Sequence, residues 1–429
     1  MDFADDFKIY CCKDSFGTLL ASKELRKELE ELHLTEFYHK IVNPLAELIV
    51  RLNLRGLPVD EQKMEAAVSG LTKEIAVIRE EIAFMAGKPL EPGTKEFKQF
   101  LYNDLGLSEG KKSKQGIGKA DKATLKRLRN ENPELAPFFN KILGLRQREK
   151  LVSTFLAKDQ VDQETWRLYP NFKIGPATGR LACKKPNFQN YPEGLVRDVF
   201  MAKKGWKFVY ADYSQLEARI FAVLAGATQL LEDFRLGRDI HDENARALFN
   251  IKPEDKPNAL HRDQAKVFFY MYMYGGDPTN LVGRGSILGD VSAESFRQTS
   301  GGFIKRHPQI PAFREKIKSQ LFSKRRLVNA FGRPRIFFGN PKDAIHSAYN
   351  FPMQSGASDL MNTRLIELDF LIPDSLVLQV HDSVMFEVRD EEVEDVKGVV
   401  KEVLERESPE FNGYKFPAEV KVGESWGEM

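Results

Sequence analysis

The segment WKFVYADYSQLEARIFAVLAG, residues 206–226, joins a predicted strand directly to a predicted helix. Its first seven residues are rich in Phe, Val and Tyr, which favour strands, and its remainder repeats apolar residues at helical spacing and ends on glycine. The segment SLVLQVHDSVMFEV, residues 375–388, predicts two further strands with His381 and Asp382 at the bend between them. Because these strands are far apart in the sequence, we expect an α+β fold whose sheet is assembled around a helical insertion.

The length and composition indicate a globular protein with more than one subdomain. The chain has 429 residues, of which 42% are apolar, and this is more chain than one hydrophobic core usually organises. Helical periodicity predicts helices over residues 41–87, 94–106 and 121–157, with GLPVD at 56–60 interrupting the first range. NAFGRPRIFF, residues 329–338, predicts a turn that leads into a strand.

The sequence predicts a reduced, cytosolic protein that makes no membrane contact. No apolar run approaches the roughly 20 residues that cross a bilayer, and the first residues, MDFADDFKIY, lack the apolar core of a signal peptide. The cysteines are Cys11, Cys12 and Cys183, and their spacing is not that of a zinc site.

Residues 110–129, GKKSKQGIGKADKATLKRLR, form a basic segment in a chain whose net charge is only +2. Asp121 is the one acidic residue of this segment. A solvated loop explains the pattern, and so does contact with the phosphate backbone of a nucleic acid. The residues themselves leave both explanations open.

Two aspartates stand at the ends of predicted strands. Asp212 follows a strand where the chain turns into a helix, and Asp382 lies at the tip of the later strand pair. If these strands share a sheet, the two carboxylates meet at its edge and offer the oxygen ligands that Mg²⁺ prefers. Two ions roughly 3.5–4 Å apart can activate a hydroxyl and stabilise a leaving phosphate oxygen. The alternative is that Asp212 caps the following helix and Asp382 fills a turn.

The segment RDQAKVFFYMYMYGG, residues 262–276, predicts a helix that carries a stripe of cations and phenol rings. Arg262, Lys266, Tyr270 and Tyr274 recur every four residues, so they share one slowly drifting face. A nucleoside triphosphate would lie along this face with its phosphates at the cationic end and its base at the aromatic end. An ordinary amphipathic helix with surface cations and core tyrosines is the alternative.

Taken together, these segments resemble the family A DNA polymerases. The three closest motifs are DYSQLEARIFA at 212–222, the segment at 262–276, and QVHDSVMFE at 379–387. The resemblance extends from about residue 8 to the C-terminus. It includes NLRGLPVD, FLYNDLGL, ATGRLACKKPNFQN, GRDIH, AFGRPR and NFPMQSGASDLM.

The resemblance implies the right-hand fold of polymerases, which is α+β with an antiparallel sheet in the palm and helical fingers and thumb. It implies a remnant of a 3′–5′ exonuclease domain at 1–40 and a thumb at 41–165. It further implies a palm formed by 166–235 and 340–429, with the fingers at 236–339 inserted between these two parts.

The resemblance also implies DNA-templated addition of deoxynucleotides to a primer 3′-hydroxyl with two Mg²⁺ ions as cofactors. Asp212, Asp382 and the carbonyl of Tyr213 would bind the metal ions, and Lys266 would protonate the leaving pyrophosphate. Glu217 would be the steric gate that rejects the ribose 2′-hydroxyl. The residues implied to contact the incoming nucleotide are Arg262, Lys266, Tyr270, Tyr274, His241, Glu217 and Gln215.

The implied partners are primer-template DNA and deoxynucleoside triphosphates, bound by a monomer. The residues implied to line the DNA are Arg180, Asn187, Gln189, Asn190, Asn350, Gln354 and His381. Such contacts can test base-pair shape, because minor-groove acceptors are shared by all correct pairs. Capping and core hydrogen bonds are an alternative role for several of these residues. The expected location is the cytoplasm of a bacterial or virus-infected cell, with an organelle as the alternative.

Three positions depart from the family pattern. Ser383 stands where the third motif usually has glutamate, so we expect an active site with one carboxylate fewer. Tyr270 replaces a phenylalanine of many bacterial members, and in the family this tyrosine accompanies acceptance of dideoxynucleotides. His346 stands where many relatives have arginine, which leaves the role of that position open.

The segment YCCKD, residues 10–14, is similar to the last motif of the family's proofreading exonuclease. Asp2, Asp5 and Asp6 are too close in sequence to supply the other carboxylates of such a nuclease. We therefore expect no intrinsic proofreading. Either the chain is a piece of a longer protein, or the exonuclease is a separate polypeptide that docks here as a further partner.

Two other functions compete with this interpretation. A single-subunit RNA polymerase shares the palm arrangement, but Glu217 and the 262–276 helix favour deoxynucleotides. A catalytically weakened DNA-binding or scaffolding module is suggested only by Ser383 and the missing exonuclease. Both aspartates and the cationic stripe are present, which favours the enzyme.

Overall fold

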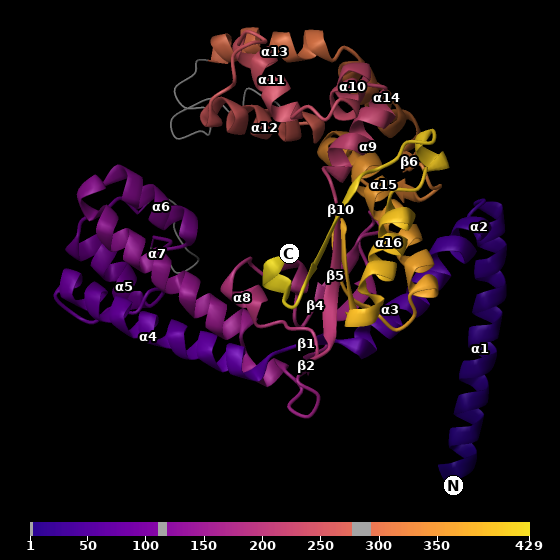
Figure 1. The fold of residues 1–429 in the computed structure, drawn as a ribbon, viewed down its shortest axis with the longest axis horizontal. Coiled ribbons are helices and arrows are strands. Elements are labelled where there is room, and N and C mark those ends of the chain that lie inside the picture. Colours follow the sequence, from indigo (N-terminus) through magenta and orange to yellow (C-terminus); the bar gives the residue numbers. More distant parts are fainter. Residues whose placement is uncertain (1–2, 110–117, 277–292) are drawn as a thin grey trace. The chain divides into compact units, whose positions relative to one another are not determined.

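The computed structural model describes residues 3–109, 118–276 and 293–429 of the chain (Figure 1). Residues 110–117, which belong to the predicted basic segment, lie outside the described residues. The chain divides into two compact units. The first contains Met1–Arg55, Phe172–Ala182 and Val209–Lys421, and the second contains Gly56–Asn171, Cys183–Phe208 and Val422–Met429.

A four-stranded sheet positions the predicted aspartates. Its strand order is β10 (Ala418–Gly423), β5 (Trp206–Tyr213), β9 (Ser383–Arg389) and β8 (Leu376–Val380). β8 and β9 pair antiparallel with Val380 opposite Ser383, so that His381 and Asp382 form the whole turn between them. The predicted assembly of one sheet from distant parts of the sequence is therefore confirmed.

Three helices of the first unit pack beside this sheet and on each other. They are α3 (Asn43–Arg55), α15 (Pro341–Leu371) and α16 (Val393–Leu404). Arg51 and Arg55 of α3 both pair with the buried Asp369 of α15, at 2.5 and 3.4 Å. These ion pairs fix the end of α15 against α3.

The helical insertion that follows β5 contains the predicted 262–276 helix. Its helices are α9 (Leu216–Ala225), α10 (Thr228–Arg235), α11 (Ile240–Phe249), α12 (Ala259–Met273), α13 (Ala293–Arg306) and α14 (Gln309–Lys324). Figure 1 shows α11 in contact with both α12 and α13. Phe268, Phe269 and Phe303 are fully buried between them.

Gly275 ends α12 in a conformation that other residues seldom adopt. Its φ is +81°, and a Cβ atom added to it would lie 2.1 Å from Cδ2 of Tyr349. A side chain at this position would therefore both strain the backbone and clash with α15. The predicted glycine stop of this helix is confirmed, and its physical reason is the close approach of Tyr349.

A short hairpin connects α14 to α15, as the turn signal in 329–338 predicts. β6 (Arg326–Val328) pairs antiparallel with β7 (Pro334–Ile336). Two further strands, β3 (Asn171–Ile174) and β4 (Leu181–Lys184), form a separate pair.

The second unit is mainly helical and contains residues 56–165 of the range predicted as a thumb, whereas residues 41–55 of that range lie in the first unit. Its helices are α4 (Glu61–Ala86), α5 (Lys95–Gln99), α6 (Lys122–Glu131), α7 (Ala136–Lys150) and α8 (Leu195–Asp198), and β1 (Leu57–Pro58) pairs with β2 (Arg167–Leu168). The helix predicted over 121–157 is interrupted, because Asn132 precedes Pro133 and leaves the helical region with φ −132° and ψ 80°.

An aromatic cluster forms part of the core of the second unit. Phe188, Tyr191, Phe200 and Trp426 are all buried, and the Phe188 and Tyr191 rings lie 4.9 Å apart. Trp426, three residues before the C-terminal Met429, donates its backbone N–H to the carbonyl of Phe200 at 3.0 Å. Phe155, within the range predicted as a thumb, packs against Tyr191 with ring centroids 5.0 Å apart, so the cluster joins residues 183–208 and 422–429 to that part of the unit.

The segment predicted as an exonuclease remnant contains two helices, α1 (Phe3–Glu31) and α2 (Thr35–Phe37). Tyr10 and Asp14 lie on α1, and Cys11 and Cys12 beside them are exposed. The exonuclease assignment and the predicted domain boundaries stay predictions. In the part of the chain that the structure describes, none of the helices has the length and apolar character that crossing a bilayer requires.

Candidate active site

Asp212 and Asp382 lie at the same end of two neighbouring strands. Asp212 is the second-last residue of β5, and Asp382 directly precedes β9, which pairs with β5. The backbone N–H of Tyr213 donates to the carbonyl of Asp382 at 3.1 Å. The predicted meeting of these two residues is thus a feature of the fold. The competing helix-cap role of Asp212 does not hold, because Gln215 is the N-cap of α9.

The environment of both aspartates opposes their ionisation. Burial raises the pKa of Asp212 to about 7, and the negative charges of Asp382 and Glu419 add to this effect, while Lys421 opposes it. Burial, together with the charge of Glu217, also raises the pKa of Asp382. Two partly buried carboxylates that repel each other form a site that a cation would stabilise.

The donor atoms at this point suit a hard divalent ion. The side chain of Tyr213 is buried and its hydroxyl donates to the carbonyl of Leu404 at 2.8 Å, so only its backbone can serve the site. Among the described residues, no three His, Cys, Asp or Glu side chains gather as a metal-binding group. The two carboxylates and the Tyr213 carbonyl are oxygen donors, which fit Mg²⁺, because this ion commonly uses one or two carboxylates with water and substrate phosphates.

A cavity of about 270 Å³ lies beside Asp382 and contains most of the predicted nucleotide contacts. Glu217 of α9 is bound from two directions in this cavity. Its carboxylate accepts hydrogen bonds from the guanidinium of Arg180 and from the hydroxyl of Tyr274. The residues that line the cavity are Arg180, Gln215, Leu216, Glu217, Tyr270, Tyr274, Ala357, Ser358, His381 and Asp382.

The aromatic half of the α12 stripe faces this cavity. The rings of Tyr270 and Tyr274 stack with their centroids 6.3 Å apart, and His241 lies 5.7 Å from Tyr270. Both tyrosines are half-buried and line the cavity. The alternative of an ordinary amphipathic helix places these tyrosines in the core, but both of them line the cavity instead.

The cationic half of the stripe is more exposed. Two nitrogens of Arg262 donate to Oδ2 of Asp239 at 3.0 and 2.7 Å, whereas Lys266 is exposed. Burial lowers the pKa of His241 to about 4, so this imidazole is neutral at pH 7. Its buried Nδ1 has no hydrogen-bond partner among the described residues. His241 can thus add a hydrogen bond to a ligand but not a positive charge.

The residues predicted to line DNA are divided between the two units. Arg180, Asn350, Gln354 and His381 belong to the first unit, where Arg180 pairs with Glu217 and His381 lines the cavity. Asn187, Gln189 and Asn190 belong to the second unit. The side chain of Asn187 accepts the backbone N–H of Gln189 at 3.2 Å, which is the capping role left open by the sequence.

Two residues inside the quoted motifs support the site, although the motifs alone assign them no role. Asp239 caps α11 by accepting the backbone N–H groups of His241 and Asp242, and it also holds Arg262. Gln379 donates its side-chain amide to the carbonyl of His381 at 2.7 Å and so braces the aspartate turn. An aspartate near the start of the range 236–339, which is expected to be helical, is a signal for a helix cap at Asp239, but its pairing with Arg262 depends on how α11 and α12 pack.

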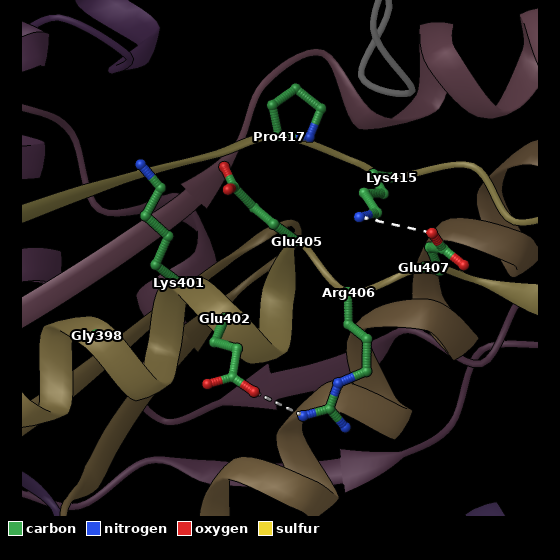
Figure 2. A pocket seen from close by; sticks show the side chains of 8 residues that line it. All are labelled: Gly398, Lys401, Glu402, Glu405, Arg406, Glu407, Lys415 and Pro417. Carbon is green, nitrogen blue, oxygen red and sulfur yellow. Dashed lines mark ion pairs between the residues drawn. The ribbon is translucent and has the colours of Figure 1, made fainter.

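A larger cavity, of about 750 Å³, lies at the end of α16 and beside the start of β10 (Figure 2). Figure 2 shows two ion pairs among the side chains that line it, Lys415 with Glu407 and Arg406 with Glu402; both have N–O distances of 3.5 Å. No residue predicted to bind nucleotide or DNA lines it. The cavity beside Asp382 is therefore the better candidate for chemistry despite its smaller size.

Comparisons with known proteins find a family and relatives that match most of the chain. The family model described as DNA polymerase family A matches residues 61–428. The chain is 29% identical to DNA polymerase I of Rhizobium leguminosarum, over 98% of the chain and 43% of that protein. It is 30% identical to the thermostable DNA polymerase I of Thermus aquaticus, over 94% of the chain and 49% of that protein. The chain thus spans about half the length of these curated relatives.

A solved structure has the same fold. It is the POL domain of Pol1 from M. smegmatis in complex with DNA primer-template and dNTP. The TM-score is 0.84 at 25% sequence identity, and the match covers 95% of this chain and 74% of that one.

Proposed function

This chain belongs to the family A DNA polymerases, and from that premise we propose that it adds deoxynucleotides to the 3′-hydroxyl of a DNA primer under the direction of a template. One observation carries the proposal: Asp212 and Asp382 converge at the ends of β5 and β9, beside a cavity walled by Tyr270 and Tyr274 of α12. The relative from M. smegmatis, whose complex contains primer-template and dNTP, supports the same ligands here.

Two Mg²⁺ ions would be held by Asp212, Asp382 and the carbonyl of Tyr213. When bound, such ions lower the pKa of the primer 3′-hydroxyl and neutralise the charge on phosphate oxygens. The raised pKa of both carboxyl groups supports this role, because a bound cation removes the repulsion between them. Ser383 contributes no carboxylate; its hydroxyl donates to the carbonyl of Val380 at 2.9 Å. The pair of aspartates would therefore act without a third acidic side chain from this turn.

The cationic residues of α12 would bind the triphosphate of the incoming nucleotide. Arg262 would exchange Asp239 for phosphate oxygens, which a guanidinium binds with paired hydrogen bonds. Lys266 would add a second positive charge one helical turn away and donate a proton to the leaving pyrophosphate. His241 would contribute a neutral hydrogen bond, consistent with its lowered pKa. Positioning and fixed charge would supply most of the rate.

Glu217 and the tyrosines would select the sugar. Arg180 and Tyr274 hold the Glu217 carboxylate in place, so that it cannot swing aside for a 2′-hydroxyl without breaking two hydrogen bonds. Tyr270 would stack near the sugar and base of the nucleotide, and Tyr274 would occupy the place of the template base until the helix moves. Gln215 lines the same cavity and would contact the nucleotide as well.

The chain would act as a monomer on DNA in the cytoplasm, and it would lack intrinsic proofreading. A separate exonuclease polypeptide would be its further partner if proofreading is supplied in trans. The seven polar residues that the resemblance implies to line the DNA would contact the newly formed duplex.

Primer extension on a templated duplex tests the function. With dNTPs and Mg²⁺ we expect extension by the parent chain, and a loss of at least about a hundredfold in rate for Asp212→Ala. Asp390→Ala, which changes an exposed aspartate, is the matched control and should keep the parent rate. Extension that proceeds equally with ATP in place of dATP would favour an RNA polymerase. DNA binding without extension would favour a scaffolding module.

A further inference from the structure

The β6–β7 hairpin has an outward face that combines a cation with apolar side chains. Arg326 lies opposite Ile336, and Val328 lies opposite Pro334. Directly opposed residues point to the same side of a two-stranded ribbon, so these side chains share one face. Val328 is 50% exposed and Ile336 is 58% exposed.

The opposite face of the hairpin is anchored in the core of the first unit. Leu327 and Phe337 are buried in a cluster with residues of α14 and α15. The guanidinium of Arg335 lies 4.8 Å from the ring centroid of Phe337 and 5.8 Å from that of Phe351. The hairpin is thereby held as a rigid support, and Phe338, directly after its second buried anchor, is 86% exposed.

The segment that forms this face carries an excess of positive charge. Residues 316–342 contain eight lysines and arginines and no aspartate or glutamate. Arg333 and Lys318 have carboxylate partners in Asp359 and Glu315. Within the described parts of the chain, the exposed Lys324, Arg326 and Lys342 have no carboxylate partner. A surface with uncompensated cations attracts a polyanion.

We propose that this face, formed by Lys324, Arg326, Val328, Ile336, Phe338 and Lys342, binds single-stranded DNA. A single strand offers both phosphates for the cations and unstacked base faces for Phe338 and its aliphatic neighbours. A duplex keeps its base faces stacked inside, so it would leave the apolar side chains unused. The proposal rests on the proposed function, because the DNA that a template-directed polymerase binds includes an unpaired, single-stranded part of the template.

The position of the hairpin in the chain supports this occupant. β7 leads through Phe338 into α15, the helix that carries Asn350 and Gln354. Arg335 of the hairpin lies against Phe351, the neighbour of Asn350 in sequence. The face is therefore rigidly coupled to the helix that is proposed to contact the paired part of the same DNA.

Binding of two primer-templates tests the proposal. One has a single unpaired template nucleotide and the other has a 5′ template overhang of about 12 nucleotides, both labelled and followed by fluorescence anisotropy. We expect Phe338→Ala and Arg326→Ala each to weaken binding of the long overhang by about fivefold or more and to leave the short one unchanged. Arg326→Ala should also reduce the salt dependence of log Kd by about 0.7, whereas Phe338→Ala should not.

Matched controls come from exposed residues of the same kinds elsewhere. Phe370→Ala removes an aromatic side chain that is 84% exposed, and Lys401→Ala removes an exposed lysine. Both controls should bind the two DNAs as the parent does, and thermal unfolding should show all four variants folded. Unchanged affinity of Phe338→Ala and Arg326→Ala for the long overhang would overturn the proposal and assign the face to another occupant, such as an acidic protein.

The test separates this inference from the proposed function. If the parent chain fails to extend the primer, the proposed function is wrong. If the parent extends the primer and the two hairpin variants lose equal affinity for both DNAs, only the single-strand inference is wrong.

Discussion

The ionisation of Asp212 gives the two-carboxylate site a measurable property. Its pKa is about 7 in the folded protein, mainly because of burial, and 3.8 is its ordinary value. Between these pH values the folded state keeps a proton that the unfolded state releases, so stability without metal falls as pH rises from about 4 to 7. The same proton competes with a divalent ion, and we expect metal affinity to fall as pH falls through 7.

Asp212→Asn removes the loss of stability that comes from ionising the buried carboxyl group, and it changes the side-chain volume little. In EDTA at pH 8 we expect the variant to be about 2 kcal/mol more stable than the parent, with a smaller gain at pH 5. Denaturant unfolding at both pH values provides the measurement. Asp390→Asn, at an exposed position, is the control and should change stability at neither pH. A gain that does not grow with pH would show that burial does not raise the pKa of Asp212.

Glu217 is the residue whose substitution should change sugar selection most. Arg180 and Tyr274 fix its carboxylate inside the cavity, so shape alone can exclude a 2′-hydroxyl. We expect Glu217→Ala to reduce the preference for dATP over ATP by at least about tenfold, and Glu217→Gln to keep most of it. Single-nucleotide incorporation kinetics measure both ratios. Equal losses in the two variants would mean that charge, and not bulk, rejects the ribonucleotide.

The positions of individual residues can be predicted from the sequence where a motif surrounds them, while their roles stay predictions. Asp212, Asp382 and the α12 stripe could be found because strand, helix and turn signals place each of them locally. The pairing of Arg262 with Asp239 could not, because it depends on the packing of α11 against α12. Long-range side-chain partners are set by tertiary contacts that periodicity does not encode.

At the scale of elements, a buried ion pair joins the β6–β7 hairpin to α15. Asp359 is fully buried and accepts hydrogen bonds from Nε and Nη2 of Arg333 at 2.8 and 2.7 Å, and from Asn329 at 2.7 Å. Removal of the carboxylate would leave a guanidinium largely buried without its counter-ion. We expect Asp359→Ala to lower the free energy of unfolding by about 3–5 kcal/mol in a urea titration.

An exposed ion pair of similar charge provides the comparison. Glu315 and Lys318 of α14 lie 3.4 Å apart with both side chains largely exposed. Glu315→Ala should cost less than about 1 kcal/mol, because water screens the pair. If the two substitutions cost the same, the Asp359 network does not hold the hairpin to α15. That outcome would also weaken the view of the hairpin as a rigid support.

The bounds of elements were predictable where one residue decides them. Gly275 ends α12 and the two-residue turn at His381–Asp382 joins β8 to β9, as the sequence indicates. The interruption at Pro133 within the range 121–157 is also a local signal, since the residue before a proline disfavours the helix. Which helices contact each other was not predictable, because many amphipathic faces are compatible with several partners.

At the scale of the whole molecule, the division into compact units differs from the predicted domain boundaries. Residues 183–208 and 422–429, expected in the palm, belong to the unit that contains 56–171. Phe188, Phe200 and Trp426 are buried together in that unit. Apolar residues in a sequence show that a segment is buried, but they do not show which core it joins.

Removal of a mismatched primer 3′ end is an activity that the whole chain either has or lacks. A two-metal nuclease needs carboxylates from separate elements that meet at one point. Tyr10 and Asp14 of the exonuclease-like motif both lie on one helix, α1. We expect the purified chain of 429 residues to leave a mismatched primer 3′ end intact while it extends a matched one. A gel assay without dNTPs measures this, with Asp14→Ala as the control for motif-dependent cleavage. If the parent removes the mismatch and Asp14→Ala does not, the chain has an intrinsic exonuclease and the prediction of no intrinsic proofreading is wrong.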